Sequence, residues 1–274
     1  MQERLNVAVA QSPGALDGPE ERLAWLSGAV EGLSDQAIDL LVLPELFLCG
    51  YNIGDAIDGR AQSPDGPAFR KIGRLARESG VAIAFGYAEK TRGRIYNSAA
   101  CVAKDGSVIG AHRKLLLPPG FESDRFGRGS DCSLFRLGAF KIAFLICYDA
   151  EFPEAFRRVG VADLVLVPTA LAAQWSVVAE RVIPARAFEN GVFVCYANHC
   201  GMENGLEYLG SSCIVAPDGT DMARADNGEA LISARLQRSR VGQARQRLPY
   251  HADRMKLAWG VTTALQYGRI SGRK

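Results

Sequence analysis

The sequence predicts an α/β protein. Short runs of β-branched and aliphatic residues alternate with helix-type segments along most of the chain. Of its 274 residues, 48% are hydrophobic and 23% are charged, a composition typical of a folded globular protein with a large core. Since α/β folds of about this size often form one unit, we expect a single domain over residues 1–274.

Eight short apolar runs have the length and the β-branched character of strands. They are residues 7–10, 40–43, 81–85, 99–103, 142–146, 164–167, 192–196 and 212–215. Four segments are expected as helices, at 20–32, 68–79, 153–159 and 176–190. Pro-Glu at 19–20 and at 153–154 suits a helix start, because the missing N–H of proline is harmless there and an acid meets the positive end of the helix dipole.

Two segments of the chain are near copies of each other. Residues 39–44 read Asp-Leu-Leu-Val-Leu-Pro and residues 163–168 read Asp-Leu-Val-Leu-Val-Pro, and each follows a strand and a helix. One interpretation is a pair of strand–helix–strand units from one ancestral pattern. The other is that both are ordinary buried strands ended by proline, since buried strands resemble one another.

Composition favours a soluble cytoplasmic protein. The 32 basic and 30 acidic residues leave a net charge of +2, so no strong field draws nucleic acid or an anionic membrane. The first residues, 1–6, lack the apolar stretch of a secretory signal, and no apolar run approaches the roughly 18 residues that span a bilayer. Seven cysteines without a CxxC spacing are expected as reduced thiols.

Charge is concentrated in a C-terminal basic arm, residues 235–274, which holds ten Lys or Arg and one acid, Asp253. Such a segment could bind RNA, but no nucleic-acid-binding motif accompanies it. We favour an arm packed on the domain or on a partner subunit, because apolar side chains interrupt the charges, namely Tyr250, Met255, Leu257 and Trp259.

Three short segments place reactive side chains at or near the ends of apolar strands. Glu45 follows Leu-Val-Leu-Pro, Lys114 ends His-Arg-Lys, and Cys147 ends the apolar run 142–146. In open α/β sheets, ligands bind at the carboxyl ends of strands. We therefore treat Glu45 and Cys147, at two strand ends, as candidates for one site.

Cys147 could act as a nucleophile if a neighbouring base or cation generates its thiolate. Taken alone, it would more often be a buried structural cysteine. A zinc site at Cys195, His199 and Cys200 is disfavoured, because no second ligand pair has metal spacing. The chain also has no phosphate-cradling glycine loop and no HExxH, so we expect neither a metal nor another cofactor.

Taken together and in this order, the motifs resemble the nitrilase, or carbon–nitrogen hydrolase, superfamily. The motifs are Pro44-Glu45, Arg113-Lys114-Leu115, Cys147-Tyr148-Asp149 and Phe152-Pro153-Glu154. Residues 96–98, 186–190, 210–212 and 217–219 add to the resemblance, which runs from about residue 5 to 260. It implies a four-layer αββα sandwich with two mixed sheets, usually assembled as a homodimer or a higher homo-oligomer.

The resemblance also implies a catalytic triad of Glu45, Lys114 and Cys147. By residue type, Glu45 would act as the general base and Cys147 would form a thioester. Lys114 and the backbone N–H of Tyr148 would stabilise the oxyanion. Glu122 resembles the second glutamate of the family, which is thought to position the lysine and the substrate; Asp124 is its rival, and either could be a solvated loop acid.

The residues around Cys147 favour amide hydrolysis over nitrile hydrolysis. True nitrilases of the superfamily generally carry Cys-Trp-Glu, whereas this chain has Cys-Tyr-Asp. Branches that act on dicarboxylic monoamides often have an arginine where this chain has Glu151. An acid there disfavours anionic substrates and suits neutral or cationic ones. Alternatively, Glu151 faces away and pairs with Arg157 or Arg158.

Aromatic side chains are the candidate walls of a small-ligand site. Besides Glu151, we name Tyr51, Phe121, Tyr148 and Trp175 as candidate substrate-binding residues, although such rings more often pack in a core. Arg186 and Glu189-Asn190, on the helix expected at 176–190, are expected to brace the site or a subunit contact.

The favoured function is thus a cytoplasmic, cofactor-free thiol amidase that acts on an aliphatic or amino-acid amide. The enzymatic alternatives are an N-carbamoyl-amine amidohydrolase, an omega-amidase and a nitrilase. An ammonia-donor glutaminase domain is disfavoured because no synthetase follows. The non-enzyme alternative is an interaction module that retained the fold; the intact Glu45, Lys114 and Cys147 disfavour it.

Overall fold

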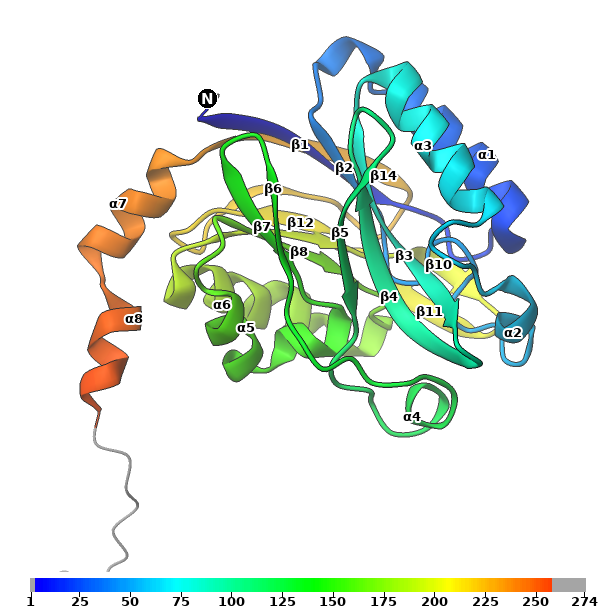
Figure 1. The fold of residues 1–274 in the computed structure, drawn as a ribbon. Helices are drawn as coiled ribbons and strands as arrows, with labels where there is room; N and C mark the ends of the chain where they lie inside the picture. The colour runs from blue at the N-terminus through cyan, green and yellow to red at the C-terminus, as the bar shows by residue number, and fades with distance from the viewer. Residues whose placement is uncertain (1–2, 258–274) are drawn as a thin grey trace, which may run out of the picture.

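Two mixed sheets form the centre of the molecule in the computed structural model, which describes residues 3–257 (Figure 1). The first sheet has the order β14 (Ala230–Gln237), β1 (Arg4–Gln11), β2 (Leu40–Val42), β3 (Ala82–Thr91), β4 (Arg94–Val102) and β5 (Val108–Arg113). The second has the order β13 (Asp221–Arg224), β12 (Cys213–Val215), β9 (Phe193–Ala197), β8 (Leu164–Pro168), β7 (Phe140–Phe144) and β6 (Leu134–Leu137). A separate hairpin joins β10 (Cys200–Glu203) to β11 (Leu206–Leu209).

The side chains of each central strand alternate between two cores. In β1, Val7 and Val9 belong to the core between the sheets, whereas Ala8 and Ala10 belong to the core under the helices α1 (Gly18–Glu31) and α3 (Pro67–Ser79). The outer face of the second sheet is covered by α5 (Pro153–Val159) and α6 (Ile183–Asn190). The predicted α/β class and the four-layer αββα arrangement are confirmed.

The two sheets repeat one topology. Read from β14 to β5 and from β6 to β13, both sheets have the same sequence of antiparallel and parallel pairings. Asp39 and Asp163, the first residues of the near-copied segments, make equivalent contacts. Each accepts a hydrogen bond from a backbone N–H of the preceding strand segment, that of Asn6 (3.0 Å) or of Lys141 (2.9 Å). The near copies are therefore equivalent strand positions.

The sequence-based prediction missed elements that carry little continuous apolar character. These are β5, β6, β10, β11, β13 and β14, together with α2 (Ala56–Arg60), α4 (Phe121–Arg125), α7 (Ser239–Arg247) and α8 (Tyr250–Asp253). The helix expected at 176–190 is interrupted by a π-helical turn, Val178–Val182, in which the N–H of Ile183 bonds to the carbonyl of Val178. Pro184, which has no N–H, lies directly after this turn.

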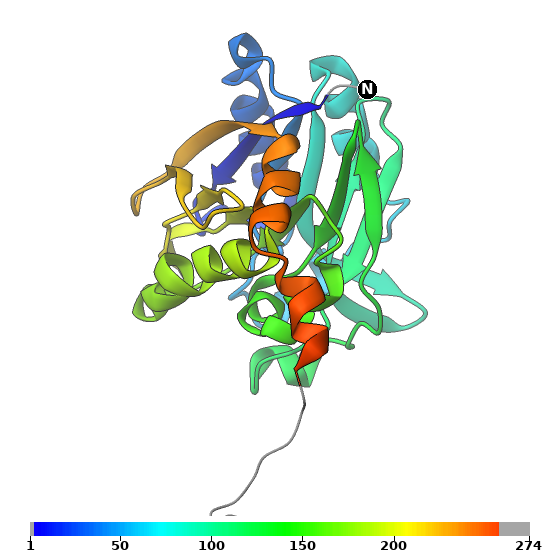
Figure 2. The ribbon, with the colours of Figure 1, turned by 90° about the vertical axis from the view of Figure 1, so that its left-hand side faces the viewer.

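The described part of the C-terminal basic arm begins inside β14 and continues through α7 and α8 down one side of the molecule (Figure 2). Leu236 and Val241 lie in the core between the sheets. Arg238 pairs with Asp163 at 3.0 Å, and Arg245 donates to the carbonyl of Gly160 at 3.0 Å. Residues 258–274, which include Trp259, lie outside the described residues. Among the helices described, none is long and apolar enough to cross a membrane.

One glycine of β3 determines how closely the loop after β2 can approach the sheet. The N–H of Gly86 donates to the carbonyl of Pro44 (3.1 Å), and its carbonyl accepts from the N–H of Leu48 (3.1 Å). A Cβ at this position would lie 2.4 Å from the nitrogen of Leu46 and 2.7 Å from the Cα of Glu45. Only a residue without a side chain leaves room for this contact.

We therefore expect Gly86→Ala to displace the loop that carries Glu45. The expected result is a loss of about 1–3 kcal/mol of unfolding free energy, typical of overpacking, together with a loss of hydrolytic activity. Chemical denaturation and an activity assay measure both effects.

The matched control is Gly28→Ala in α1, where an added Cβ meets no heavy atom within 4 Å. Alanine is favoured over glycine inside a helix by up to about 1 kcal/mol, so this variant should be as stable as the natural chain or more stable. Equal behaviour of the two variants would contradict the steric argument.

Candidate active site

Glu45 lies in the loop after β2, at the carboxyl end of the first sheet's parallel strands. Its side chain is fully buried, and the next residue, Leu46, has a positive φ of 49°. The peptide groups of the loop are tied to the second half of the chain, because the N–H of Glu45 donates to the carbonyl of Thr169 (3.3 Å). A backbone contact with the second half of the chain therefore helps to hold the loop that carries the Glu45 carboxylate.

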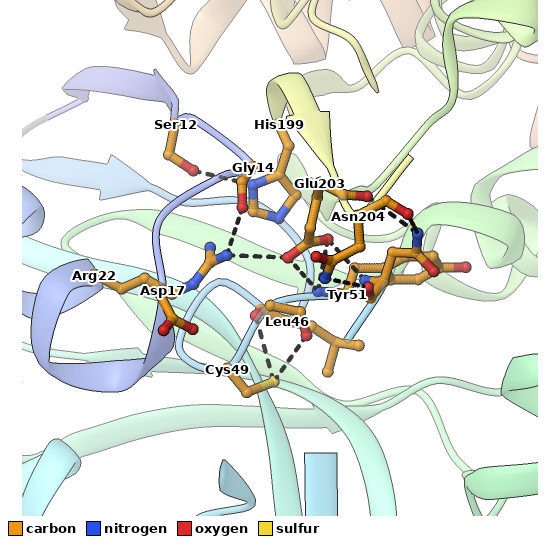
Figure 3. Close-up of polar contacts among 12 residues, drawn as sticks. Ser12, Gly14, Asp17, Arg22, Leu46, Cys49, Tyr51, His199, Glu203 and Asn204 are labelled. Atoms are coloured by element: carbon orange, nitrogen blue, oxygen red, sulfur yellow. Dashed lines mark hydrogen bonds and ion pairs between the residues drawn. The ribbon is translucent and has the colours of Figure 1, made fainter. Parts of the chain in front are cut away.

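His199, drawn in Figure 3, binds the carbonyl of the same residue. Its Nε2 lies 2.8 Å from the carbonyl oxygen of Glu45, and its Nδ1 lies 3.1 Å from Ser12 Oγ. Burial, and next the positive charge of Arg22, lower the pKa of His199 to about 3. The imidazole is therefore neutral, so Nε2–H donates to Glu45 and Nδ1 accepts from Ser12.

Lys114 follows β5 and brings two carboxylates together. Its Nζ lies 2.7 Å from Glu45 Oε1 and 2.6 Å from Glu122 Oε1, and all three side chains are buried. Glu122 lies in the short helix α4, whereas Asp124, its rival in the sequence, is exposed to solvent. The geometry thus favours Glu122 as the second acid of the site.

Two further side chains hold this pair of acids. Asn97 of β4 donates through Nδ2 to Glu45 Oε1 at 2.7 Å and to Glu122 Oε2 at 3.2 Å. The hydroxyl of Tyr51 donates to Glu122 Oε1 at 2.8 Å. The hydrogen bond from Asn97 lowers the pKa of Glu45, since a bond to a charged acceptor favours its charged form.

Cys147 lies at a sharp turn between β7 and α5. Its φ of 45° is in the left-handed region, which costs a non-glycine residue about 1–3 kcal/mol and is often found at functional sites. Asp149, two residues later, is buried and accepts the backbone N–H groups of Ile146, Leu115 and Leu116. Because Leu115 directly follows Lys114, Asp149 connects the cysteine turn to the lysine segment.

The electrostatics of the site keep the thiol protonated in the resting state. Burial, followed by the negative charge of Glu45, raises the pKa of Cys147, and Lys114 only partly opposes this. Burial raises the pKa of Glu45 to about 7, although Lys114 lowers it. For Lys114 itself, burial acts to lower the pKa, but the two carboxylates raise it above the ordinary range. A permanent ammonium thus lies beside a base poised near neutrality.

The candidate substrate-binding residues divide into two groups. Tyr51, Phe121, Tyr148 and Glu151 are all partly buried, and the rings of Tyr51 and Phe121 pack edge to face at 5.9 Å. Trp175 lies on the short 3₁₀ helix Ala173–Trp175 with 55% of its surface exposed. Among the described residues, the Trp175 side chain makes no hydrogen bond to the buried acids, and its ring packs against no other aromatic ring.

Glu151 does not make the helix-surface pair considered as the alternative. Arg157 pairs with Glu189 at 3.4 Å, and within residues 3–257 the Glu151 carboxylate has no ion pair. Arg186 donates instead to the backbone carbonyl of Glu151 at 2.6 Å and pairs with Glu189 at 3.1 Å. Among residues 3–257, the carboxylate of Glu151, the last residue of the turn that begins at Cys147, therefore has no ion-pair partner.

The sequence analysis missed the roles of several buried polar residues. Asn97 was recognised only as part of a family-like segment, Asp149 only as part of the cysteine motif, and His199 only as a poor zinc ligand. Their partners lie 52, 34 and 154 residues away in the chain, so no local spacing could reveal them. Over the described residues, no group of three or more His, Cys, Asp or Glu is arranged to hold a metal ion.

Comparison with known proteins identifies the class to which this fold and site belong. Residues 6–246 match the carbon–nitrogen hydrolase family. The chain belongs to this family, and the resemblance to the nitrilase superfamily is confirmed.

Relatives and solved structures agree with this assignment. A protein of Pseudomonas protegens described as a hydrolase in the pqqF 5' region is 44% identical, over 79% of this chain and 78% of its own length. An (R)-stereoselective amidase of a Pseudomonas species is 31% identical over 84% of this chain and 85% of its own. The amidase of Nesterenkonia sp. AN1, in a cysteine variant complexed with butyramide, has a TM-score of 0.76 at 29% identity, covering 89% of this chain and 95% of its own. The protein is thus an enzyme of the amide-hydrolysing carbon–nitrogen hydrolases, and the interaction-module alternative is wrong.

The raised pKa of Glu45 predicts a pH dependence. A general base works in its ionised form, so kcat/KM of the natural enzyme should fall as the pH decreases through about 7. The Asn97→Ala variant lacks a donor that favours the ionised carboxylate, so its acid limb should move to higher pH. Steady-state kinetics from about pH 4 to pH 9 measure the acid limb of the natural enzyme and of the variant.

The control for this shift is Ser98→Ala, the next residue of β4. The Ser98 hydroxyl donates to Glu89 at 2.8 Å, away from the two site acids, so the acid limb should stay in place. An acid limb of the natural enzyme near 4.5, or a shift to lower pH in Asn97→Ala, would contradict the assignment of Glu45 as the base.

Proposed function

We propose that this enzyme hydrolyses a small amide, such as an aliphatic or amino-acid amide, to a carboxylate and ammonia through a thioester on Cys147. The observation that carries the proposal is the buried Lys114 ammonium, which bridges Glu45 and Glu122 close to a protonated thiol. A thiol in this state needs a base before it can attack, and Glu45 has the pKa of such a base.

The proposed reaction has two halves. Glu45 accepts the thiol proton while the sulfur of Cys147 attacks the amide carbon, and Lys114 and the N–H of Tyr148 stabilise the oxygen that becomes negative. The C–N bond then breaks, Glu45 gives the proton to the leaving nitrogen, and ammonia departs. In the second half, Glu45 activates a water molecule, which attacks the thioester and releases the carboxylate and the thiol.

Glu122 has a supporting role in this scheme. Its carboxylate holds Lys114 in position, and its negative charge favours the ionised lysine. Lys114 therefore acts throughout as a fixed cation and not as a proton donor.

The surroundings of Glu151 support a neutral or cationic substrate. Its carboxylate is partly buried near the cysteine turn, and Arg186 reaches only its backbone carbonyl. An amino-acid amide with a free amine would offset this negative charge, whereas the anionic substrate of an omega-amidase would be repelled by it. The stereoselective amidase and the butyramide-bound amidase among the relatives support an amide as the substrate class.

The cell compartment and the assembly are further proposals. All seven cysteines are free, which supports a reducing compartment such as the cytoplasm. The rings of Phe188 on α6 and Tyr250 on α8 are partly exposed, and their centroids lie 5.9 Å apart. This exposed aromatic surface supports a homodimer.

A substrate panel tests the reaction. Ammonia release is measured from neutral amides, amino-acid amides, ω-amides of dicarboxylates, N-carbamoyl amines and nitriles. We expect turnover of neutral or amine-bearing amides, and its complete loss in Cys147→Ala. Preferred turnover of carbamoyl amines with release of carbon dioxide, or of nitriles, would replace the amidase proposal by one of its enzymatic alternatives.

A single substitution tests the role assigned to Glu151. In Glu151→Gln, kcat/KM for an amide with a protonated amine should fall about tenfold relative to a neutral amide of equal size, equivalent to about 1.4 kcal/mol. The matched control is Glu154→Gln, which changes an exposed acid at the start of α5 and should leave this ratio unchanged. A ratio that is equal in the natural enzyme and in both variants would remove Glu151 from the substrate site.

A further inference from the structure

Glu203, at the end of β10, is a buried carboxylate outside the tetrad of Glu45, Glu122, Lys114 and Cys147. Only 5% of its surface is exposed. Its partners come from three parts of the chain, and Figure 3 shows two of them, Arg22 and the segment at Tyr51. Arg22 of α1 donates through Nη2 at 3.1 Å, and the hydroxyl of Tyr208 on β11 donates to the other oxygen.

The remaining donors to Glu203 are peptide groups of the loop that follows Glu45. The N–H of Tyr51 lies 3.2 Å from both carboxylate oxygens, and the N–H of Asn52 lies 2.7 Å from Oε2. Gly50 makes the close approach possible, because a Cβ there would lie 2.6 Å from Glu203 Oε1 and its φ is 95°. One charged group of the hairpin thus determines where the Tyr51 backbone lies.

The position of the Tyr51 backbone determines what its hydroxyl can reach. That hydroxyl donates to Glu122 Oε1, the same oxygen that receives the Lys114 ammonium. Hydrogen bonds therefore connect Arg22 and Glu203 to the Tyr51 peptide, and connect the Tyr51 hydroxyl to Glu122 and Lys114. The covalent side chain of Tyr51 joins the two sets of bonds. Each member is buried or partly buried, so water competes little for these bonds.

We propose that Glu203, paired with Arg22, is a positioning residue of the active site, and that it acts on Glu122 and Lys114 through Tyr51. The proposal rests on the proposed function only in that Lys114 and Glu122 serve the reaction at Cys147. If Glu203 had a purely structural role, it would hold the loop against the hairpin, and the effect of replacing it would not depend on the Tyr51 hydroxyl.

A double-mutant cycle between Glu203→Gln and Tyr51→Phe distinguishes the two roles. Glutamine keeps the shape and one acceptor but loses the charge that pairs with Arg22 and attracts the two N–H groups. We expect each single variant to lower kcat by about tenfold to a hundredfold, the loss that a displacement of about 1 Å can cause, with a smaller change in KM. In the Tyr51→Phe background, Glu203→Gln should then lower kcat by less than about threefold.

The same cycle is measured a second way, by the rate at which iodoacetamide alkylates Cys147. The alkylation of the other cysteines is subtracted with Cys147→Ala, and thermal denaturation verifies that each variant is folded. Alkylation needs no substrate, so it tests the positioning role separately from the proposed function. If the two substitutions have coupled effects on the alkylation rate but the enzyme turns over no amide, the proposed function is contradicted and the positioning role stands.

Independent effects would overturn the inference. If Glu203→Gln lowers kcat and the alkylation rate by the same factor with tyrosine or phenylalanine at position 51, Glu203 does not act through the Tyr51 hydroxyl. Should Glu203→Gln fail to fold, Tyr208→Phe replaces it in the cycle, because it removes one donor to Glu203 and leaves the carboxylate. The effects of Tyr208→Phe and Tyr51→Phe on kcat and on the alkylation rate should be coupled in the same way. Additive effects of these two substitutions would also overturn the inference.

Discussion

A buried ammonium is the constraint on which the site depends. Lys114 has no access to solvent, and an unpaired charge in that position would destabilise the fold by several kcal/mol. It therefore requires carboxylates, and these come from segments far apart in the chain, the loop after β2 and the helix α4. Asn97 and Tyr51 donate further hydrogen bonds to these two acids. The neighbouring polar residues follow from this single requirement.

The two halves of the fold are equivalent in topology but not in chemistry. The parallel pairs Val7–Leu40 and Ile142–Leu164 correspond, so Ser12 of the first half occupies the place of Cys147 in the second, and Thr169 occupies the place of Glu45. The repeat supplies two similar strand ends that face each other, and different residue types at these ends divide the roles. The first half provides the carboxylate of Glu45, the proposed base, and the second provides the thiol of Cys147, the proposed nucleophile.

Contacts between the halves hold these strand ends in register. Asp149 of the second half binds the N–H groups of Leu115 and Leu116 in the first, and Thr169 and His199 bind the peptide of Glu45. Glu45, Asp149, Thr169 and His199 are buried, and Leu115 and Leu116 are partly buried. A buried polar group that lost its partner would not regain a contact with water, so leaving these contacts unmade would be costly. The reactive groups are thus oriented by neighbours that do not react, which is how a site keeps its geometry without mobile parts.

The α/β class, eight of the strands and the three motif residues Glu45, Lys114 and Cys147 could be predicted from the sequence, because they depend on local signals. Continuous apolar runs such as 164–167 produce buried strands whatever surrounds them, and the ordered motifs at Glu45, Lys114 and Cys147 identified the superfamily. The edge strand β14 was missed, since exposed residues alternate with partly buried ones along it and its pairing partner lies more than two hundred residues away.

The polar residues that surround Glu45, Lys114 and Cys147 became apparent from the packed fold alone. The sequence favoured Glu122 through the resemblance and left Asp124 as its rival, whereas in the fold Glu122 is buried against Lys114 and Asp124 faces solvent. Glu203 looks like an ordinary hairpin acid until the fold brings Arg22 and the Tyr51 peptide to it from 181 and 152 residues away. The physical reason is that burial and hydrogen bonding, which determine the charge state and direction of an acid, belong to the packed environment and not to the local chain.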